Sequence, residues 1–357
     1  MLNFRCTGDW GIIESKKYIG GGIINIRELA AEIGVSPATV SIVLNDRPGV
    51  SDETRKRIKE AIEEAGYVPA VRKKKTTHQI LLLKCVLGEG LLTEENQGFV
   101  GMIVDASMQT LTEKGYSPTL MRVQLGSESV LENIEFSKYE GVIVIATEIR
   151  KEQFRMLEKI PIPFVCVDNM MPGMEYSCVG IDNEENVRIA LEYAAECGYK
   201  RIGYLKSSYD AQNFEDRARA FYHFAEMYHL EVREEDEIAL NSSMMKAYEE
   251  MKAYLDSHDK GNLPPCFFAD NDIIALGAMK AFRHRDFEIP EDVAIVGFDD
   301  IPYSAVCSPS LTTVQVSRQL IGKVAAGQLI ERMQDEKYRK VKTRISGDLI
   351  VRTSMKK

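Results

Sequence analysis

The chain has no run of 18 consecutive apolar residues, the length that a membrane-spanning helix needs. Its first 22 residues, MLNFRCTGDWGIIESKKYIGGG, lack the charged segment followed by an apolar one that marks a secretion signal. The seven cysteines are scattered, odd in number and never spaced as Cys-x-x-Cys. Because most of them stand among apolar residues, we expect buried, reduced thiols. These absences predict a cytoplasmic protein that does not enter a membrane.

Motifs typical of enzymes are absent as well. The sequence holds no GxGxxG, GxxxxGK(S/T), GxSxG or HExxH pattern, and Gly88-Glu89-Gly90 lacks the third glycine of a dinucleotide-binding loop. The five histidines show no spacing typical of metal ligands. We therefore predict no cofactor, no metal and no enzymatic activity.

Charge is distributed unevenly along the chain. The 357 residues are 45% apolar and 28% charged, which indicates a globular protein of two or three domains. The net charge is −9, but residues 24–79 contain ten lysines and arginines against eight acidic residues. The most cationic part of this segment is the run from Arg72 to Lys75. A run of charged residues is usually just exposed to solvent. This run is a better candidate for a functional one because it directly follows the segment described next.

The segment from residue 26 to residue 69 opens with an apolar set spaced three and four residues apart: Ile26, Leu29, Ala30 and Ile33. This spacing predicts one face of a short amphipathic helix. Gly34 ends the helix, because glycine readily takes the left-handed conformation of a sharp turn. Ser36-Pro37 then reads as the N-cap and first residue of a second helix over 37–45. Two short helices around a tight glycine turn form a helix-turn-helix.

A third helix is predicted over residues 55–66, after a turn at 45–49. Its apolar stripe comprises Ile58, Ile62, Ala65 and Tyr67. The three helices make a unit of about 45 residues, which is near the lower size limit for independent folding. Spacing alone leaves two interpretations open, a DNA-binding module or a mere packing module.

Beyond residue 79 the pattern alternates between buried strands and helices. The predicted strands are 80–86, 116–123, 141–146, 164–167, 201–205, 237–240, 266–269 and 294–298. The predicted helices are 99–114, 183–197, 216–227, 244–257, 272–283 and 320–333. Alternation at this spacing indicates doubly wound parallel sheets. About 280 residues suffice for two such lobes with a cleft between them, although folds of this class also host many enzymes.

Polar residues directly follow two of these strands. Asn271 and Asp272 come after strand 266–269, and Asp299 comes after strand 294–298. Because ligands of open parallel sheets bind beyond the carboxyl ends of the strands, we expect these residues at the mouth of the cleft. For Asp272, which opens a helix, we favour a role as N-cap.

The run LAAEIGVSPATVSIVLND, followed by VSDETRKRIKEAIEEAGYVP, resembles the DNA-binding headpiece of the LacI/GalR family of bacterial transcription regulators. In that family the second helix lies in the major groove. The resemblance implies a DNA-contacting set of Ser36, Pro37, Ala38, Thr39, Ser41, Ile42, Asn45 and Arg47. Within this set, Pro37, Ala38 and Ile42 stand where base-reading side chains sit. Since none of these three offers a hydrogen bond, we expect specificity to rest on thymine methyl groups and on DNA shape.

The segment after the headpiece departs from the family pattern. Relatives have an Ala-x-x-Leu helix whose leucine enters the minor groove, whereas this chain has AVRKKKTTHQ, which is several residues shorter and lacks the leucine. We therefore expect a tether that contacts phosphates, rather than a wedge that kinks the duplex. The tether residues are Arg72, Lys73, Lys74 and Lys75.

The resemblance continues to the end of the chain. ADNDIIALGAMKAF and EIPEDVAIVGFDDIPYS, among other segments, are similar to the family's ligand-binding core, which resembles periplasmic sugar-binding proteins. It implies that Arg217, Asn271 and Asp299 bind hydroxyl groups of an effector, and that Phe99 stacks on a sugar face. A guanidinium, an amide and a carboxylate suit the paired donors and acceptors of a polyol.

Structural roles compete with these functional ones at several positions. Asp182 reads equally well as an N-cap, and Asp300 as a structural residue. Arg217 also fits a surface salt bridge, and Phe99 on its helix also fits the core. The histidines fit solvated or internally satisfied positions.

Together these observations predict four regions: an extension (1–23) that is disordered or comes from a start codon assigned too early, a helix-turn-helix headpiece (24–70), a basic hinge (71–79) and a two-lobed core (80–357). The predicted function is a homodimeric transcription regulator, a repressor, that binds a pseudo-palindromic operator and responds to a small molecule, a carbohydrate. Two alternatives remain: a sugar-binding protein with vestigial DNA binding, and a regulator controlled by a phosphoprotein.

Overall fold

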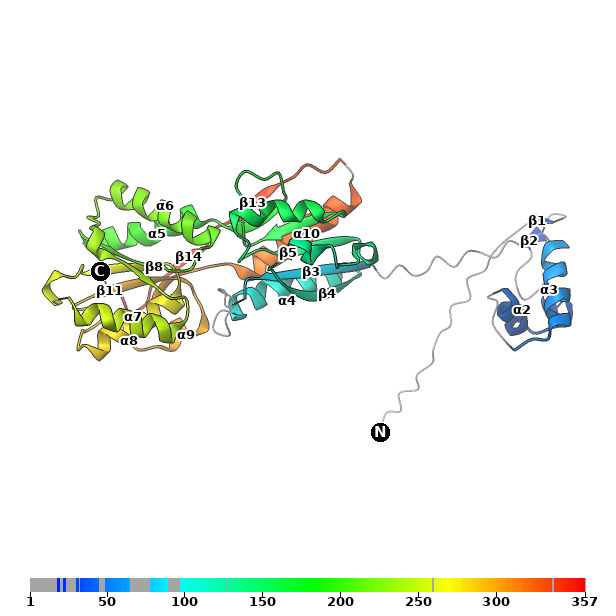
Figure 1. The fold of residues 1–357 in the computed structure, drawn as a ribbon, viewed down its shortest axis with the longest axis horizontal. Coiled ribbons are helices and arrows are strands. Elements are labelled where there is room, and N and C mark those ends of the chain that lie inside the picture. The colour runs from blue at the N-terminus through cyan, green and yellow to red at the C-terminus, as the bar shows by residue number, and fades with distance from the viewer. Residues whose placement is uncertain are drawn as a thin grey trace, which may run out of the picture. The chain divides into compact units, whose positions relative to one another are not determined.

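The fold is taken from a computed structural model that describes most of the chain. The described residues are 18–19, 22–23, 30–31, 33–44, 49–64, 78–88, 97–126, 128–258, 260–335 and 337–356. The chain divides into two compact units, residues 1–76 and residues 77–357 (Figure 1). None of the described helices is long and apolar enough to cross a membrane.

The smaller unit contains helices α2 (Pro37–Leu44) and α3 (Asp52–Glu64), and residues 30, 31 and 33 are also helical. The turn predicted at Gly34 is confirmed, since its φ is 71°. Its N–H donates to the carbonyl oxygen of Ala31, and the next N–H, of Val35, donates to Ala30. This pair of hydrogen bonds is the usual way in which a helix ends at a left-handed glycine.

A small apolar core holds these helices together. Its buried members are Ala30, Val40, Val43 and Ile58, and Ile33, Val35, Val50 and Ile62 pack against it. These residues include Ala30 and Ile33 of the first predicted face and Ile58 and Ile62 of the third, so the spacing argument is confirmed at these positions. Ile26, Leu29, Ala65 and Tyr67 lie outside the described residues. In the first 23 residues the structure describes only β1 (Tyr18–Ile19) paired antiparallel with β2 (Gly22–Ile23).

The larger unit consists of two lobes, each built on a six-stranded sheet. The first, here the N-lobe, has strand order β13-β7-β6-β5-β3-β4, and every neighbouring pair is parallel. Its strands are β3 (His78–Val86), β4 (Tyr116–Gln124), β5 (Gly141–Ile145), β6 (Phe164–Val167), β7 (Cys178–Ile181) and β13 (Lys342–Ile345). Helices α4 (Gln97–Glu113) and α10 (Arg318–Gln334) pack on one face, and the 3-10 helix η3 (Lys151–Lys159) packs on the other.

Residues 80–83 of strand β3 show why a buried strand reads as a continuous apolar run. Ile80 and Leu82 point into the cluster under α4 and α10, whereas Leu81 and Leu83 point into the opposite cluster. Successive side chains of a strand face opposite sides, so a strand covered on both faces must be apolar at every position.

The second lobe, here the C-lobe, has strand order β14-β12-β11-β10-β8-β9, and only β14 is antiparallel to its neighbour. Its strands are β8 (Gly203–Ser207), β9 (Glu237–Leu240), β10 (Cys266–Ala269), β11 (Ala294–Asp299), β12 (Thr312–Gln315) and β14 (Asp348–Ile350). Helices α5 (Asn183–Glu196) and α6 (Gln212–Met227) cover one face (Figure 1). Helices α7 (Met244–Asp256) and α8 (Asp272–His284) cover the other, and α9 (Pro302–Val306) follows β11.

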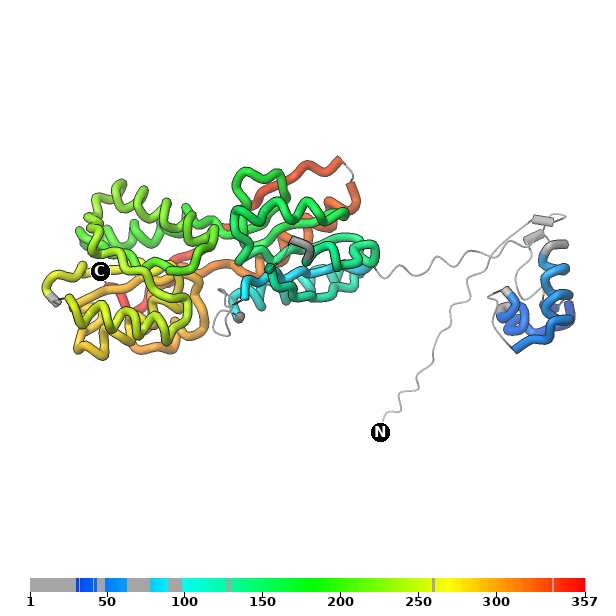
Figure 2. The backbone as a smooth tube through the Cα atoms, viewed as in Figure 1, coloured from blue at the N-terminus to red at the C-terminus, as the bar shows by residue number. Residues whose placement is uncertain are grey.

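Three short segments cross between the lobes (Figure 2): residue 182, residues 316–317 and residues 346–347. They lie against one another. The N–H of Asp182 donates to the carbonyl oxygen of Ile345 at 3.0 Å. A Cβ on Gly347 would lie 2.2 Å from the carbonyl oxygen of Gln315, so only glycine fits there. The two lobes are therefore joined by a narrow, closely packed hinge.

Candidate functional site

The first turn of α2 forms an exposed edge of the headpiece. Ser36 caps the helix, since its Oγ accepts a hydrogen bond from the N–H of Thr39 at 3.1 Å. Ser36, Pro37 and Ala38 are exposed, whereas Thr39 and Ile42 are half-buried. An exposed helix N-terminus suits DNA, because its free N–H groups attract phosphate while its side chains reach the bases.

The remaining predicted DNA contacts cannot be placed. The side chain of Ser41 lies outside the described residues, as do Asn45, Arg47, Arg72, Lys73, Lys74 and Lys75. Their assignment to DNA stays a prediction from the family resemblance.

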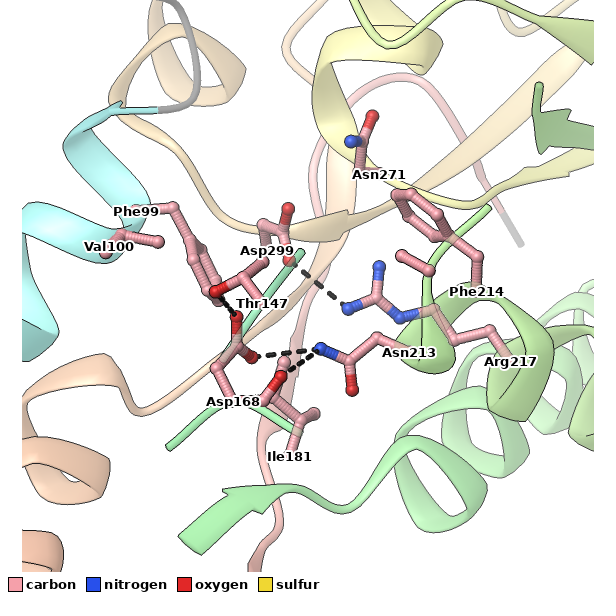
Figure 3. Close-up of a pocket in the computed structure, with 11 residues that line it drawn as sticks. Phe99, Val100, Thr147, Asp168, Ile181, Asn213, Phe214, Arg217, Asn271 and Asp299 are labelled. Atoms are coloured by element: carbon pink, nitrogen blue, oxygen red, sulfur yellow. Dashed lines mark hydrogen bonds and ion pairs between the residues drawn. The ribbon is translucent and has the colours of Figure 1, made fainter. Parts of the chain in front are cut away.

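A cavity between the two lobes brings together the four predicted effector residues, Phe99, Arg217, Asn271 and Asp299 (Figure 3). Other lining residues include Thr147, Asp168, Asn213 and Phe214. Polar groups and aromatic rings thus converge from both lobes, as in most small-molecule sites. The volume is about 30 Å³, which is about the share of liquid water that one molecule occupies.

Arg217 on α6 is at the centre of the cavity wall and is only 3% exposed. Its Nε donates to Oδ1 of Asn183 at 2.9 Å, and its Nη1 donates to the carbonyl oxygen of Asp270. The guanidinium also lies over the ring of Phe298, 3.7 Å from its centre. These contacts fix the guanidinium plane, and they show that Arg217 is not the surface salt-bridge residue that we weighed as its alternative.

Asp299 ends β11 and faces Arg217, with 3.7 Å between Oδ1 and Nη2. Among the described residues no group donates a hydrogen bond to this buried Oδ1. Burial raises the pKa of Asp299 to about 8, although Arg217 opposes the rise. Its φ of 115° lies in a region that non-glycine residues rarely adopt. A buried acceptor without a donor, held in a strained conformation, is a strong indication of a ligand site.

A second polar chain crosses the cavity floor. Asn213 on α6 donates from Nδ2 to Oδ1 of Asp168 at 3.0 Å, and Oγ1 of Thr147 donates to Oδ2 of the same carboxylate at 2.7 Å. Oδ1 of Asn213 accepts from Nδ2 of Asn183 at 2.9 Å. Asp168 and Thr147 belong to the N-lobe, so these hydrogen bonds join the lobes across the cleft.

The two parts of the chain match two known families. Residues 25–70 match the bacterial regulatory proteins of the lacI family, and residues 191–355 match the periplasmic binding protein-like domain. The chain thus joins a lacI-type DNA-binding headpiece to a periplasmic-binding-protein-like core. It is accordingly a DNA-binding transcription regulator with a binding-protein-like core.

Relatives support this assignment over nearly the whole chain. The HTH-type transcriptional repressor PurR of Mannheimia succiniciproducens is 26% identical over 340 residues, covering 93% of this chain and 98% of the relative. PurR of Haemophilus influenzae (strain PittEE) is 27% identical over 352 residues with the same coverage. Among solved structures, the complex of the transcriptional regulator CelR with cellobiose superposes with a TM-score of 0.68 at 26% identity, covering 93% of this chain and 99% of that one.

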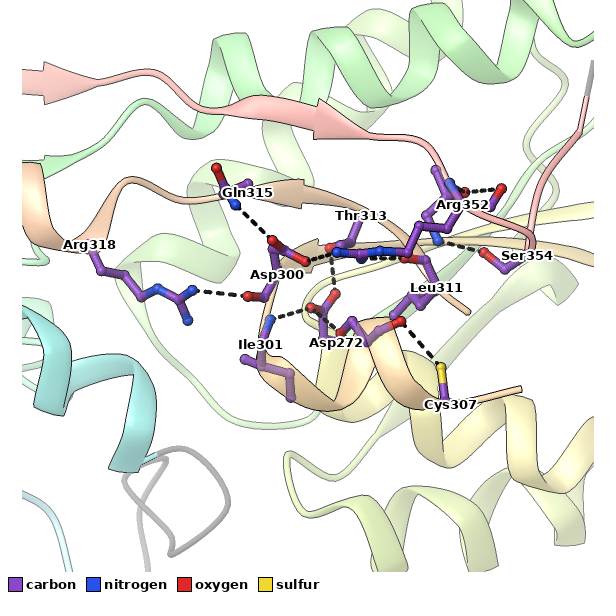
Figure 4. Close-up of polar contacts among 12 residues, drawn as sticks. Asp272, Asp300, Ile301, Cys307, Leu311, Thr313, Gln315, Arg318, Arg352 and Ser354 are labelled. Atoms are coloured by element: carbon purple, nitrogen blue, oxygen red, sulfur yellow. Dashed lines mark hydrogen bonds and ion pairs between the residues drawn. The ribbon is translucent and has the colours of Figure 1, made fainter. Parts of the chain in front are cut away.

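One prediction for the cleft is wrong. The N-cap of α8 is Asn271, whose Oδ1 accepts from the N–H of Ile274 at 2.9 Å. Asp272, which we favoured as the cap, is fully buried and accepts from the hydroxyls of Ser304 and Thr313 (Figure 4). The cap therefore sits one residue earlier, and Asp272 ties α8 to α9 and β12.

The structure confirms the structural roles of Asp182 and Asp300. Asp182 does cap α5, accepting from the N–H of Glu185 at 3.4 Å. Asp300 is structural, because its carboxylate pairs with Arg352 at 2.6 Å and accepts from Gln315 at 2.8 Å. Phe99 has both roles: it packs against the apolar core, and it lines the cavity, pointing from α4 toward Thr147 and Asp168 (Figure 3).

Sequence reasoning missed several cavity residues. Asp168 directly follows β6, so the rule that selected Asn271 and Asp299 also applies to it. Asn213 and Asn183 stand in the first turns of helices, where asparagine usually indicates only a cap. Among the described residues no group of three or more metal-binding side chains lies together.

Proposed function

We propose that this protein is a transcriptional repressor that binds a pseudo-palindromic operator as a homodimer and is released or retained by a small carbohydrate bound between its lobes. A two-fold dimer presents two copies of α2 to two half-sites. The polar cleft binds a ligand without transforming it, and we infer no enzymatic activity.

The unsatisfied carboxylate oxygen of Asp299 carries the effector half of the proposal. A ligand hydroxyl between this oxygen and Arg217 would supply the donor that the fold leaves out. The amide of Asn271 and the ring of Phe99 would then contact the ligand as well. The ligand of the similar CelR structure is cellobiose, a carbohydrate.

The size of the cavity supports coupling between ligand and lobes. Small-molecule pockets typically hold roughly 300 Å³ or more, whereas this cavity holds about 30 Å³. An effector therefore enters only if the lobes move apart about the hinge or if Phe99 withdraws. Because the ligand binds one lobe arrangement better than the other, it shifts the equilibrium between them by that difference in affinity.

Selection of DNA fragments by the full-length protein tests the regulator. We expect a palindromic site whose log affinity falls linearly with log salt, since phosphate contacts release counterions. Sedimentation at the same concentrations reports whether the bound species is a dimer. If no site emerges while the core binds sugars, the alternative of a vestigial headpiece is correct.

Titration of the protein–operator complex with cellobiose and other small sugars tests the effector. We expect one sugar class to change operator affinity at least fivefold, within the usual range of allosteric coupling. If no sugar binds but a phosphorylated protein partner changes operator affinity, control by a phosphoprotein is correct instead.

A further inference from the structure

A second cavity lies beside the hinge, around the first turns of α10. It has a volume of about 350 Å³, and its lining extends from Gln315 through Lys323, with Met102 of α4 opposite. Two of the lining side chains are cationic, Arg318 and Lys323, and none is acidic. The lining therefore carries a net positive charge, unlike the cleft.

The helix terminus in this cavity is open. Ser317 is the N-cap of α10, but its side chain makes no capping hydrogen bond. The N–H of Arg318 donates to the carbonyl oxygen of Val316 at 2.8 Å. Those of Gln319 and Leu320 have no acceptor within the part of the chain that the structure describes. Free N–H groups at the positive end of a 17-residue helix attract anions.

Arg318 adds an independent indication of a ligand. Its side chain is only 8% exposed, and its buried Nε has no hydrogen-bond partner among the described residues. Its Nη2 donates to the carbonyl oxygen of Asp300 at 2.9 Å, but the carboxylate of Asp300 is taken by Arg352 and Gln315 (Figure 4). A buried polar group normally has a hydrogen-bond partner, and the Nε–H of Arg318 has none among the described residues.

We propose that this cavity binds a small oxyanion, a phosphate or carboxylate group. Nε of Arg318 and the free N–H groups of Gln319 and Leu320 donate to it, and the exposed ammonium of Lys323 completes its neutralisation. A tetrahedral or planar oxyanion offers several acceptors, which suits a guanidinium and a helix N-terminus together. The site is distinct from the effector cleft and does not depend on the effector being a sugar.

The position of Arg318 leaves two sources for the anion. Its guanidinium lies over the ring of Phe99, 5.7 Å from the ring centre, and Phe99 lines the effector cavity. The anion is therefore either a free ion or an anionic group carried by a molecule that also occupies the cleft. The free ion and the ligand-borne group would present the same oxyanion to the first turn of α10.

Titration of the full-length protein with inorganic phosphate tests the site, with sodium chloride added to hold the ionic strength constant. We expect saturable binding by isothermal calorimetry and about tenfold weaker binding in Lys323→Gln, because one of two cations is lost. The control is Lys246→Gln, an exposed lysine on α7, which should bind phosphate like the wild type. Equal phosphate binding by all three proteins, or none by the wild type, would overturn the proposal.

Parallel titrations with glucose and glucose 6-phosphate identify the source. If Lys323→Gln weakens inorganic phosphate and glucose 6-phosphate equally, and the wild type binds the two with similar affinity, the site takes a free ion. If the wild type binds glucose 6-phosphate much more tightly than glucose or inorganic phosphate, and Lys323→Gln weakens both phosphate compounds but not glucose, the anion is a group of a cleft ligand. Sedimentation checks the assembly of Lys323→Gln, for which we expect the wild-type mass. A variant that assembles differently but binds phosphate with unchanged affinity per folded chain would contradict a direct contact.

Discussion

Oδ1 of Asp299 lies 3.7 Å from Nη2 of Arg217, and both side chains are buried. A charge-assisted hydrogen bond would be about 2.8 Å long. The two groups face each other, therefore, without closing the contact. Arg217 is fixed by Asn183 and the backbone of Asp270, so it cannot move to meet the carboxyl group without breaking other hydrogen bonds. The fold holds a donor and an acceptor ready for a third group.

Asp299→Ala should abolish the effector response and leave operator binding intact. The change removes the acceptor for a ligand hydroxyl, and we expect effector affinity to fall at least tenfold, roughly the cost of one hydrogen bond lost in a buried site. Operator affinity without effector should stay within about twofold. Fluorescence anisotropy with labelled operator measures both quantities. Glu249→Ala, at an exposed position on α7, is the matched control; a collapse of operator affinity in Asp299→Ala alone would show that the residue serves the fold.

The stability of the core should fall as the pH rises from about 4 to about 8. Burial raises the pKa of Asp168, Asp270 and Asp272 to about 6 and that of Asp299 to about 8. The folded state therefore binds these protons more tightly than the unfolded chain, whose aspartates titrate near 3.9. The stability that these carboxyl groups contribute is complete below pH 4 and is lost as the pH passes their folded pKa values.

Asp299→Asn isolates one part of this pH dependence. An amide cannot ionise, so the difference in unfolding free energy between wild type and variant should change steadily up to about pH 8 and then level off. Urea denaturation at half-unit steps from pH 5 to pH 9 measures it. A difference that is constant over this range would mean that Asp299 titrates normally in the folded protein.

The parallel sheets could be predicted from sequence because their central strands are buried on both faces. Residues 164–167, 237–240 and 266–269 were predicted with the bounds that the structure shows. The edge strands β4 and β9 were predicted as well, whereas the opposite edge of each sheet was harder. The strands β12, β13 and β14 were missed. Three of the four residues of β12 are polar, β13 alternates between exposed and half-buried residues, and β14 has no buried residue. Strand β7 was missed as well, although it is fully buried and as long as three of the strands that were predicted.

The cleft residues could be selected only where strand ends or family resemblance marked them. Asn271 and Asp299 follow strands, and the structure places both at the cavity with Arg217. Asn183 and Asn213 hold Arg217 and Asp168 in place by hydrogen bonds. These are tertiary contacts, which join α5, α6 and the N-lobe. No local pattern reports such pairings. The misplaced cap at Asp272 has the same origin, because the carboxylate of Asp272 accepts hydrogen bonds from Ser304 and Thr313, which are distant from it in the sequence.

Gly34→Ala should weaken operator binding without affecting the core. A Cβ at this position meets no atom within 4 Å, so the effect comes only from the φ of 71°. An alanine in the left-handed region costs roughly 1–2 kcal/mol, which is a large share of the stability of so small a headpiece. We expect at least a threefold loss of operator affinity and unchanged effector binding. Gly327→Ala in α10, where the added Cβ also meets no atom and φ is not positive, should match the wild type in both assays.

Ala38→Gln should change the operator that is selected. Ala38 is exposed on the first turn of α2, where the family resemblance places a base-reading side chain. A glutamine adds a donor and an acceptor that pair best with adenine in the major groove, a preference of about 1–3 kcal/mol. Selection of fragments by the variant should therefore enrich A·T at one position in each half-site. The slope of log affinity against log salt should not change, because no phosphate contact is gained or lost. Selection of the wild-type sequence by Ala38→Gln would mean that this residue faces the backbone of the DNA, not its bases.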